Sequence, residues 1–157
     1  MMSDRVILTK YLPEPAVPVI LEWLKVQKAQ LKITRGRNTK LGDYRPPLKY
    51  KFHRISVNHN LNKYHFLITL VHEFAHLTNW EKNRNQVKPH GNEWKREFGE
   101  LMQNFIAADI FPADIYPVLN RFLKNPTSTS ANTELTRKLR SYDNSAKLRT
   151  PDLVGQK

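Results

Sequence analysis

Two histidines and a glutamate stand close together near the middle of the chain, in the pattern His72-Glu73-Phe74-Ala75-His76, or H-E-x-x-H. On a helix, residues four apart lie on one face, so His72 and His76 would direct two imidazoles at one point. A tetrahedral zinc ion takes two of its protein ligands in that geometry. Glu73, one position round the helix, is placed to act as a general base rather than as a third ligand. The alternative interpretation is a pair of structural histidines beside a salt-bridging glutamate.

The residues around this pattern predict a buried helix. An apolar stretch that begins at Tyr64 leads into the pattern and continues to Trp80, which is longer than an ordinary strand. One stripe at helical spacing is apolar and a second one carries the histidines and the glutamate. A helix with two such faces is typical of a metal site at the floor of a cleft.

Three arrangements would supply a third metal ligand. The extended pattern H-E-x-x-H-x-x-G-x-x-H is excluded, because Asn79 and Lys82 occupy its glycine and histidine positions. A carboxylate from the following helix would be Glu93 or Glu97. The option we favour is His90, since neutral imidazole is the commonest ligand of this kind and a loop there would set its direction.

The combination of motifs resembles the SprT-like zinc metalloprotease family, which includes the Spartan proteases. H-E-x-x-H is followed by a tryptophan four residues on, a polar loop, and then H-G-x-x-W-K. The resemblance covers roughly Tyr11 to Asn125 in the order of its elements and is most specific from His72 to Lys95. One departure is that many members carry a four-cysteine zinc ribbon after the protease core, whereas this chain contains no cysteine.

This resemblance implies a zinc metalloendopeptidase that hydrolyses peptide bonds in protein substrates. It implies that His72, His76 and His90 bind one Zn²⁺ per chain and that Glu73 is the catalytic residue. Eukaryotic members of the family digest proteins cross-linked to DNA, so DNA-bound proteins and a role in DNA repair are the corresponding expectation for substrates.

Periodicity along the chain predicts an α+β fold. Short alternating segments at 31–35, 39–44 and 52–58 read as strands, and helical spacing recurs at 17–30, after Asn92, and at 111–124. We expect a small antiparallel sheet packed on the H-E-x-x-H helix and neighbouring helices, which is a zincin-like arrangement.

The remaining histidines are weaker candidates for metal binding. His53 and His59 share one face of the last predicted strand, and we interpret both as structural or surface residues. His65 lies about two turns before the motif, too far along the helix to share the same ion.

The chain is strongly basic, with a net charge of +12. Between Lys25 and Arg54 there are ten Lys or Arg residues and a single acid, Asp43. Such a surface attracts phosphate backbones, so Arg35, Arg37, Lys49 and Lys51 are predicted to contact DNA. The alternative function is a basic nucleic-acid-binding module whose zinc site is structural or latent.

Composition changes after Asn125. Residues 1–125 are predicted to form the metalloprotease domain, and residues 126–157 a polar, basic tail that is poorly ordered apart from two possible helical turns at 134–140.

No apolar run is long enough to span a membrane and no signal peptide is visible, so no membrane partner and a cytoplasmic location are expected. The sequence leaves the oligomeric state open.

Overall fold

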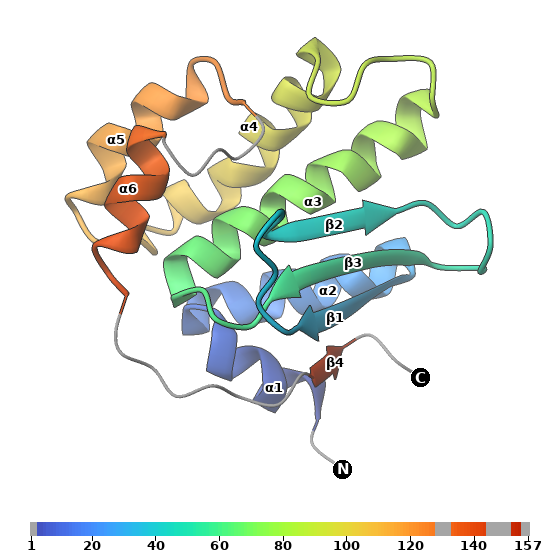
Figure 1. Cartoon of the computed structure of the whole chain (residues 1–157), viewed down its shortest axis with the longest axis horizontal. Coiled ribbons are helices and arrows are strands. Elements are labelled where there is room, and N and C mark those ends of the chain that lie inside the picture. The colour runs from blue at the N-terminus through green and yellow to red at the C-terminus, as the bar shows by residue number, and fades with distance from the viewer. Residues whose placement is uncertain (1–2, 128–132, 144–151, 155–157) are drawn as a thin grey trace.

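A four-stranded sheet and a long helix, α3, form the two layers on which the rest of the chain packs (Figure 1). The computed structural model describes residues 3–127, 133–143 and 152–154. The α+β class expected from the sequence is confirmed. In chain order, the elements are α1 (Asp4–Tyr11), η1 (Glu14–Ala16), α2 (Val17–Gln27), β1 (Ala29–Thr34), β2 (Gly42–Arg45), β3 (His53–Asn58), α3 (Lys63–Asn83), α4 (Asn92–Ala107), α5 (Ile115–Leu123), α6 (Glu134–Arg140) and β4 (Asp152–Val154).

The first helix was not expected from the sequence. Ser3 caps α1 by accepting a hydrogen bond from the backbone N–H of Val6, and the helix buries Ile7, Leu8 and Tyr11 in the core. The second helix ends earlier than its periodicity predicted, because Lys28 adopts a left-handed conformation with φ of 53°. The chain therefore turns into β1 two residues sooner than expected.

The sheet has the order β2-β3-β1-β4, and its central pairing corrects the expectation of an antiparallel sheet. Strands β2 and β3 are antiparallel, as are β1 and β4, but β1 and β3 run parallel. The alternation predicted for the central strands holds: Leu31, Ile33, Ile55 and Val57 are buried in the core on one face.

Asn58 explains why β3 lies between β1 and β2. The segment that joins β1 to β2 crosses the end of β3, where the Asn58 side-chain amide donates to the carbonyls of Arg37 (3.2 Å) and Lys40 (3.0 Å). The Asn58 backbone N–H donates to the Leu41 carbonyl at 2.9 Å. These bonds fix a crossing that a strand-by-strand reading of the sequence does not reveal, because they join residues about 20 positions apart.

Helix α3 runs between the sheet and α4 (Figure 1). Asn62 caps it by accepting from the backbone N–H groups of Tyr64 and His65, and most of its middle section is buried. It spans 21 residues. Neither α3 nor any other helix of the described residues is long and apolar enough to cross a membrane.

Two segments of the predicted tail have defined structure: α6 occupies the two helical turns predicted at 134–140, and β4 was not predicted. Helix α6 packs against α5 and α3, with Leu135 and Leu139 buried, and Asn62 donates to the Leu139 carbonyl at 2.8 Å. Strand β4 pairs with β1, opposite Leu31 to Ile33. The boundary at residue 125 stays a prediction, but α6 and β4 are part of the packed fold.

Candidate metal centre

The H-E-x-x-H pattern lies on α3 as the spacing predicted. The rings of His72 and His76 are 5.0 Å apart between centroids and face the same side of the helix. The opposite side of this helical segment contributes Phe74 and Ala75 to the hydrophobic core. The helix therefore presents two imidazoles on a rigid, packed element.

His90 completes the group from the loop between α3 and α4. Its Nε2 lies 2.9 Å from His76 Nε2 and 3.1 Å from His72 Nε2. The backbone of His90 has φ of 60°, a left-handed conformation that a histidine rarely adopts and that sets the direction of its side chain. The three ligand nitrogens all lie within 4.8 Å of one another, and the nitrogens of a tetrahedral zinc site are about 3.3 Å apart. The three imidazoles could hold a metal ion.

The protonation of these imidazoles also suits metal binding. Burial lowers the pKa of His72 well below its ordinary value, and the proximity of His76 and His90 adds to that effect. Burial likewise lowers the pKa of His76 to about 4 and lowers that of His90. All three rings are therefore neutral near pH 7, the form in which an imidazole nitrogen offers its lone pair to a metal.

Trp94, in the first turn of α4, holds the three imidazoles in place. It is fully buried, and its ring centroid lies 4.8 Å from those of His72 and His90 and 5.6 Å from that of His76. Its indole Nε1–H donates to the His72 carbonyl at 3.2 Å. Trp94 belongs to the buried side of α4, and its ring forms the wall behind the imidazoles.

Glu73 is a buried carboxyl with an abnormal pKa. Only 6% of its surface is exposed. Burial raises its pKa to about 8, with a further contribution from the negative charge of Asp43, while Arg37 and Lys40 act in the opposite direction. A carboxyl whose pKa lies near neutrality can both accept and release a proton at physiological pH.

Gly42, the first residue of β2, makes room for this carboxyl. A Cβ at position 42 would lie 2.9 Å from Glu73 Oε2 and 3.0 Å from the Thr69 Cγ2 methyl. Any larger residue would push against the glutamate. Gly42 was not among the residues predicted for the site, although a glycine inside a predicted strand is a signal that another group approaches the backbone closely.

The imidazoles and Glu73 lie at the floor of a cleft with a volume of about 540 Å³. One wall is the edge strand β2 with the residues before it, and the other is the loop that carries His90. Arg140 of α6, from the segment predicted to be a tail, also lines the cleft. The lining residues are 38–44, His72, Glu73, His76, Pro89, His90 and Arg140.

The alternative carboxylate ligands do not join the histidine group. Glu97 is buried on α4, where its Oε2 accepts from Lys82 Nζ at 2.6 Å. Neither Glu97 nor Glu93 belongs to a group of potential ligands within the part of the chain that the structure describes.

The other histidines have separate environments. His53 is buried, with Nε2 2.7 Å from Glu81 Oε2 and Nδ1 2.8 Å from the Tyr44 hydroxyl. Because a carboxylate only accepts, Nε2 carries the ring proton, and Tyr44 donates to Nδ1. His65 is buried in α3 beneath α6, its pKa lowered to about 4 by burial.

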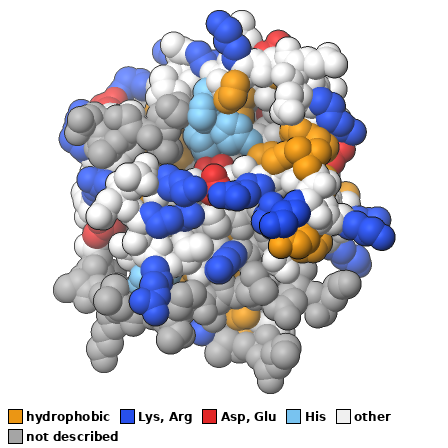
Figure 2. Space-filling view, turned by 45° about the vertical axis from the view of Figure 1, so that its right-hand side comes forward, with side chains coloured by type: hydrophobic (Ala, Val, Ile, Leu, Met, Phe, Trp, Pro, Cys, Tyr) orange, Lys and Arg blue, Asp and Glu red, His pale blue; other side chains and the backbone are white. Residues whose placement is uncertain are grey.

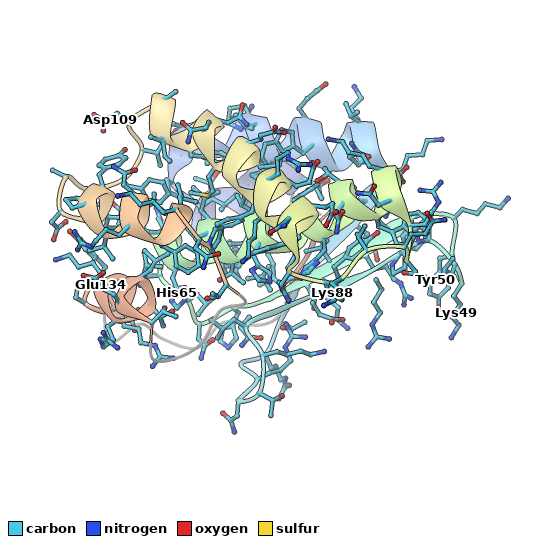
Figure 3. The ribbon with its side chains drawn as sticks, turned by 90° about the horizontal axis from the view of Figure 1, so that it is seen from above. Lys49, Tyr50, His65, Lys88, Asp109 and Glu134 are labelled. Carbon is cyan, nitrogen blue, oxygen red and sulfur yellow. The ribbon has the colours of Figure 1, made fainter. Side chains whose placement is uncertain are left out.

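The four basic residues predicted to contact DNA fall into two classes. Arg35, Lys49 and Lys51 are exposed, and Lys49 projects with Tyr50 from the β2–β3 loop, at the opposite end of the molecule from Glu134 of α6 (Figure 3). Arg37 is partly buried instead: its Nε donates to Asn58 Oδ1 at 2.7 Å and its Nη1 to Ser56 Oγ at 3.1 Å.

Comparison with known proteins agrees with this site. The sequence model of the SprT-like family matches residues 19–116, well over half of the chain and the part that contains all three histidines. No curated protein and no solved structure matches the chain. The chain belongs to the SprT-like family.

Proposed function

We propose that this SprT-like protein is a zinc metalloendopeptidase. The observation that carries the proposal is the juxtaposition of a buried carboxyl, Glu73, with three neutral imidazoles at the floor of an open cleft. The donor set fits zinc, which binds histidine nitrogens in tetrahedral sites and in catalytic sites retains an open position. We assign His72, His76 and His90 as the ligands. When bound, zinc would supply a Lewis acid for a carbonyl oxygen and a positive charge that favours the ionised form of Glu73.

Glu73 performs the proton transfers in this proposal. Its carboxylate accepts the proton of a water that attacks the peptide carbonyl, and the same oxygen then gives that proton to the leaving amine. The low polarity around the side chain keeps its pKa high enough for the second step. The absence of a Cβ at Gly42 leaves room for the carboxyl beside the imidazoles.

The edge strand β2 supports an extended peptide as substrate. Among the residues that the structure describes, it pairs with β3 on one side only, and its residues 42–44 line the cleft. An edge strand offers backbone N–H and C=O groups to a further strand, which binds a peptide without regard to most of its side chains. We therefore propose that the substrate lies alongside β2, with its scissile bond over Glu73.

Metal analysis combined with a peptidase assay tests this proposal. The purified protein should contain about one zinc per chain and should cleave an unfolded protein at internal bonds. A chelator should abolish the cleavage, and added zinc should restore it. Metal-loaded protein that leaves every unfolded substrate intact, with or without DNA, would favour the alternative function, a basic nucleic-acid-binding module with a latent zinc site.

We further propose that DNA brings the cleft to protein substrates that are bound to it. Exposed side chains favour this second function: Arg35, Lys49 and Lys51 are exposed cations, and the same β2–β3 loop exposes 74% of Leu48 and 44% of Tyr50. Because Arg37 bonds within the fold, the three exposed residues are the better test. Replacing them together by Ser should weaken DNA binding and flatten its salt dependence, by up to about one unit of slope per lost phosphate contact.

A further inference from the structure

The outer face of the sheet carries a groove in which half of the lining residues are cations. It has a volume of about 280 Å³ and is distinct from the metal cleft, although Lys40 and Asp43 line both. Figure 2 shows blue Lys and Arg side chains beside the pale-blue imidazoles on one face of the molecule. The charged residues that line the groove are Lys32, Arg37, Lys40, Asp43, Arg45 and Arg54.

The charge of this groove is poorly balanced. Asp43 is its single acid, and it already pairs with Lys40 (3.4 Å) and Arg45 (3.0 Å). Within the described residues, Arg37 and Arg54 have no ion-pair partner. Like charges that converge without counter-charges repel one another, so an arrangement of this kind is costly unless an anion occupies it.

The register of the sheet sharpens this imbalance. Arg45 of β2 lies directly opposite Arg54 of β3, on the same face. Like charges in directly opposed cross-strand positions destabilise a sheet. The Arg54 guanidinium lies over the Tyr50 ring, 4.6 Å from its centroid, which orients the group but supplies no negative charge.

Two residues that line the groove have a buried donor without a hydrogen-bond partner in the described part of the chain. Arg37 places Nε and Nη1 on Asn58 and Ser56, which leaves Nη2 buried and unbonded, and Arg54 Nε is in the same situation. A buried donor without an acceptor costs stability. Burial lowers the pKa of Arg37, although the negative charges of Asp43 and Glu73 act in the opposite direction.

We propose that this groove is a phosphate-binding site. A phosphate group carries several strong acceptor oxygens, which match guanidinium donors in fixed pairs, and its negative charge would give Arg37 and Arg54 an ion-pair partner. The phosphate can come from a nucleic-acid backbone or from a small phosphate ester. Only the first source rests on the DNA-binding part of the proposed function. Because the groove adjoins the metal cleft through Lys40 and Asp43, a phosphate held there lies beside the peptide site.

A pair of variants with equal loss of charge tests the site. Arg45→Thr with Arg54→Thr removes two cations from the groove and places β-formers at two strand positions. Lys49→Thr with Lys51→Thr removes two cations from the neighbouring loop. Inorganic phosphate is titrated at constant ionic strength into the zinc-loaded proteins, and binding is followed by the shift in melting temperature and by calorimetry. The parent and the loop variant should bind phosphate alike, and the groove variant at least about tenfold more weakly.

The outcomes separate this inference from the peptidase proposal. If the parent does not bind phosphate, the groove is not a phosphate site. If the two variants bind phosphate equally, the groove is also ruled out, because phosphate bound at the metal would give that result. Zinc content and peptide cleavage, measured on the same samples, report on the proposed enzyme independently. A mixed-sequence single-stranded oligonucleotide and thymidine monophosphate then identify the source. If the groove variant loses more affinity for the oligonucleotide than the loop variant does, the phosphate comes from a nucleic-acid backbone. If the groove variant loses affinity only for thymidine monophosphate, the phosphate comes from a small ester.

Discussion

The two walls of the metal cleft are built in different ways. The helical wall, as we use the term, comprises α3 at the floor of the cleft, the loop that carries His90, and α4 behind them. His72 and Trp94 are buried there, and on α3 the sequence spacing sets which residues meet. The sheet wall is made by β2 and the segment before it, which are partly exposed and come from a crossing connection held by Asn58. The helical wall supplies every chemical group of the proposed reaction, and the sheet wall supplies the shape.

This difference shows which parts of the site a short sequence pattern specifies and which parts depend on the whole fold. Residues four apart on a helix meet whatever the remainder of the fold does, so the imidazoles can be read from the sequence. The place where Glu73 meets Gly42 depends on how two segments 31 residues apart are brought together. Variants on the helical wall should therefore abolish chemistry or metal binding outright, and variants on the sheet wall should reduce activity by degrees.

The largest effect should follow Glu73→Gln. The amide has nearly the same shape but cannot accept a proton at neutral pH, so peptide cleavage should fall by about 10²- to 10⁴-fold. Zinc content and the melting temperature should stay close to those of the parent, because Glu73 is assigned no metal bond. Cleavage assays on samples with matched zinc content measure the effect.

Glu93→Gln is the matched control for this change. Glu93 lies in the first turn of α4, close in sequence to Trp94 but outside the histidine group. Its replacement should leave cleavage within about twofold of the parent, as for most surface changes. Full activity in Glu73→Gln, or a comparable loss in both variants, would remove Glu73 from the role of general base.

Metal affinity should fall next most steeply in His90→Ala. Changes to residues that merely support a metal ligand weaken binding by about 10- to 100-fold, so loss of a ligand should cost at least that much. Zinc titration against a chromogenic chelator measures the change. His53→Ala provides the comparison, since His53 is a buried histidine bonded to Tyr44 and Glu81. If His53→Ala loses zinc and His90→Ala retains it, the ligand assignment is wrong.

The sequence predicted more of the helical wall than of the sheet wall. The positions of His72, His76 and His90 followed from helical spacing and from the family motif, and the structure brings them together. The parallel pairing of β1 with β3 did not follow, because Asn58 bonds a loop that no local pattern identifies. The two helical turns of α6 were predicted, but their docking was not, because it depends on contacts between distant segments, such as Asn62 with Leu139.

On the sheet wall, Gly42→Ala should have the largest effect. The new Cβ would approach Glu73 Oε2 to 2.9 Å, so the carboxyl must move away from its place beside the imidazoles. Displacement of a catalytic group by a fraction of an ångström to one ångström lowers turnover by up to about 100-fold. The turnover number should fall while zinc content stays constant.

Gly99→Ala is the control, because a Cβ at position 99 of α4 would meet nothing within 4 Å. Alanine should stabilise that helix by roughly 0.5–1 kcal/mol and leave cleavage unchanged. Parent-like turnover in Gly42→Ala would mean that the sheet wall does not hold the glutamate, and the contrast between the two walls would then lose its chemical meaning.

The smallest effect should come from Tyr44→Phe, which removes a hydroxyl from a residue that lines the cleft. Tyr44 donates its proton to His53 Nδ1, so the hydroxyl serves the packing of β2 against β3 and not the reaction. The phenylalanine leaves a buried imidazole nitrogen without its donor, which should lower the free energy of unfolding by about 1–2 kcal/mol. Denaturant titration measures that loss, with Tyr50→Phe on the exposed loop as a control that should change stability by less than about 0.5 kcal/mol.

Cleavage by Tyr44→Phe should remain within about twofold of the parent under conditions where both are folded. A fall of tenfold or more in turnover, at unchanged zinc content, would instead place the Tyr44 hydroxyl among the groups that stabilise the reacting carbonyl, and would give the sheet wall a chemical role of its own.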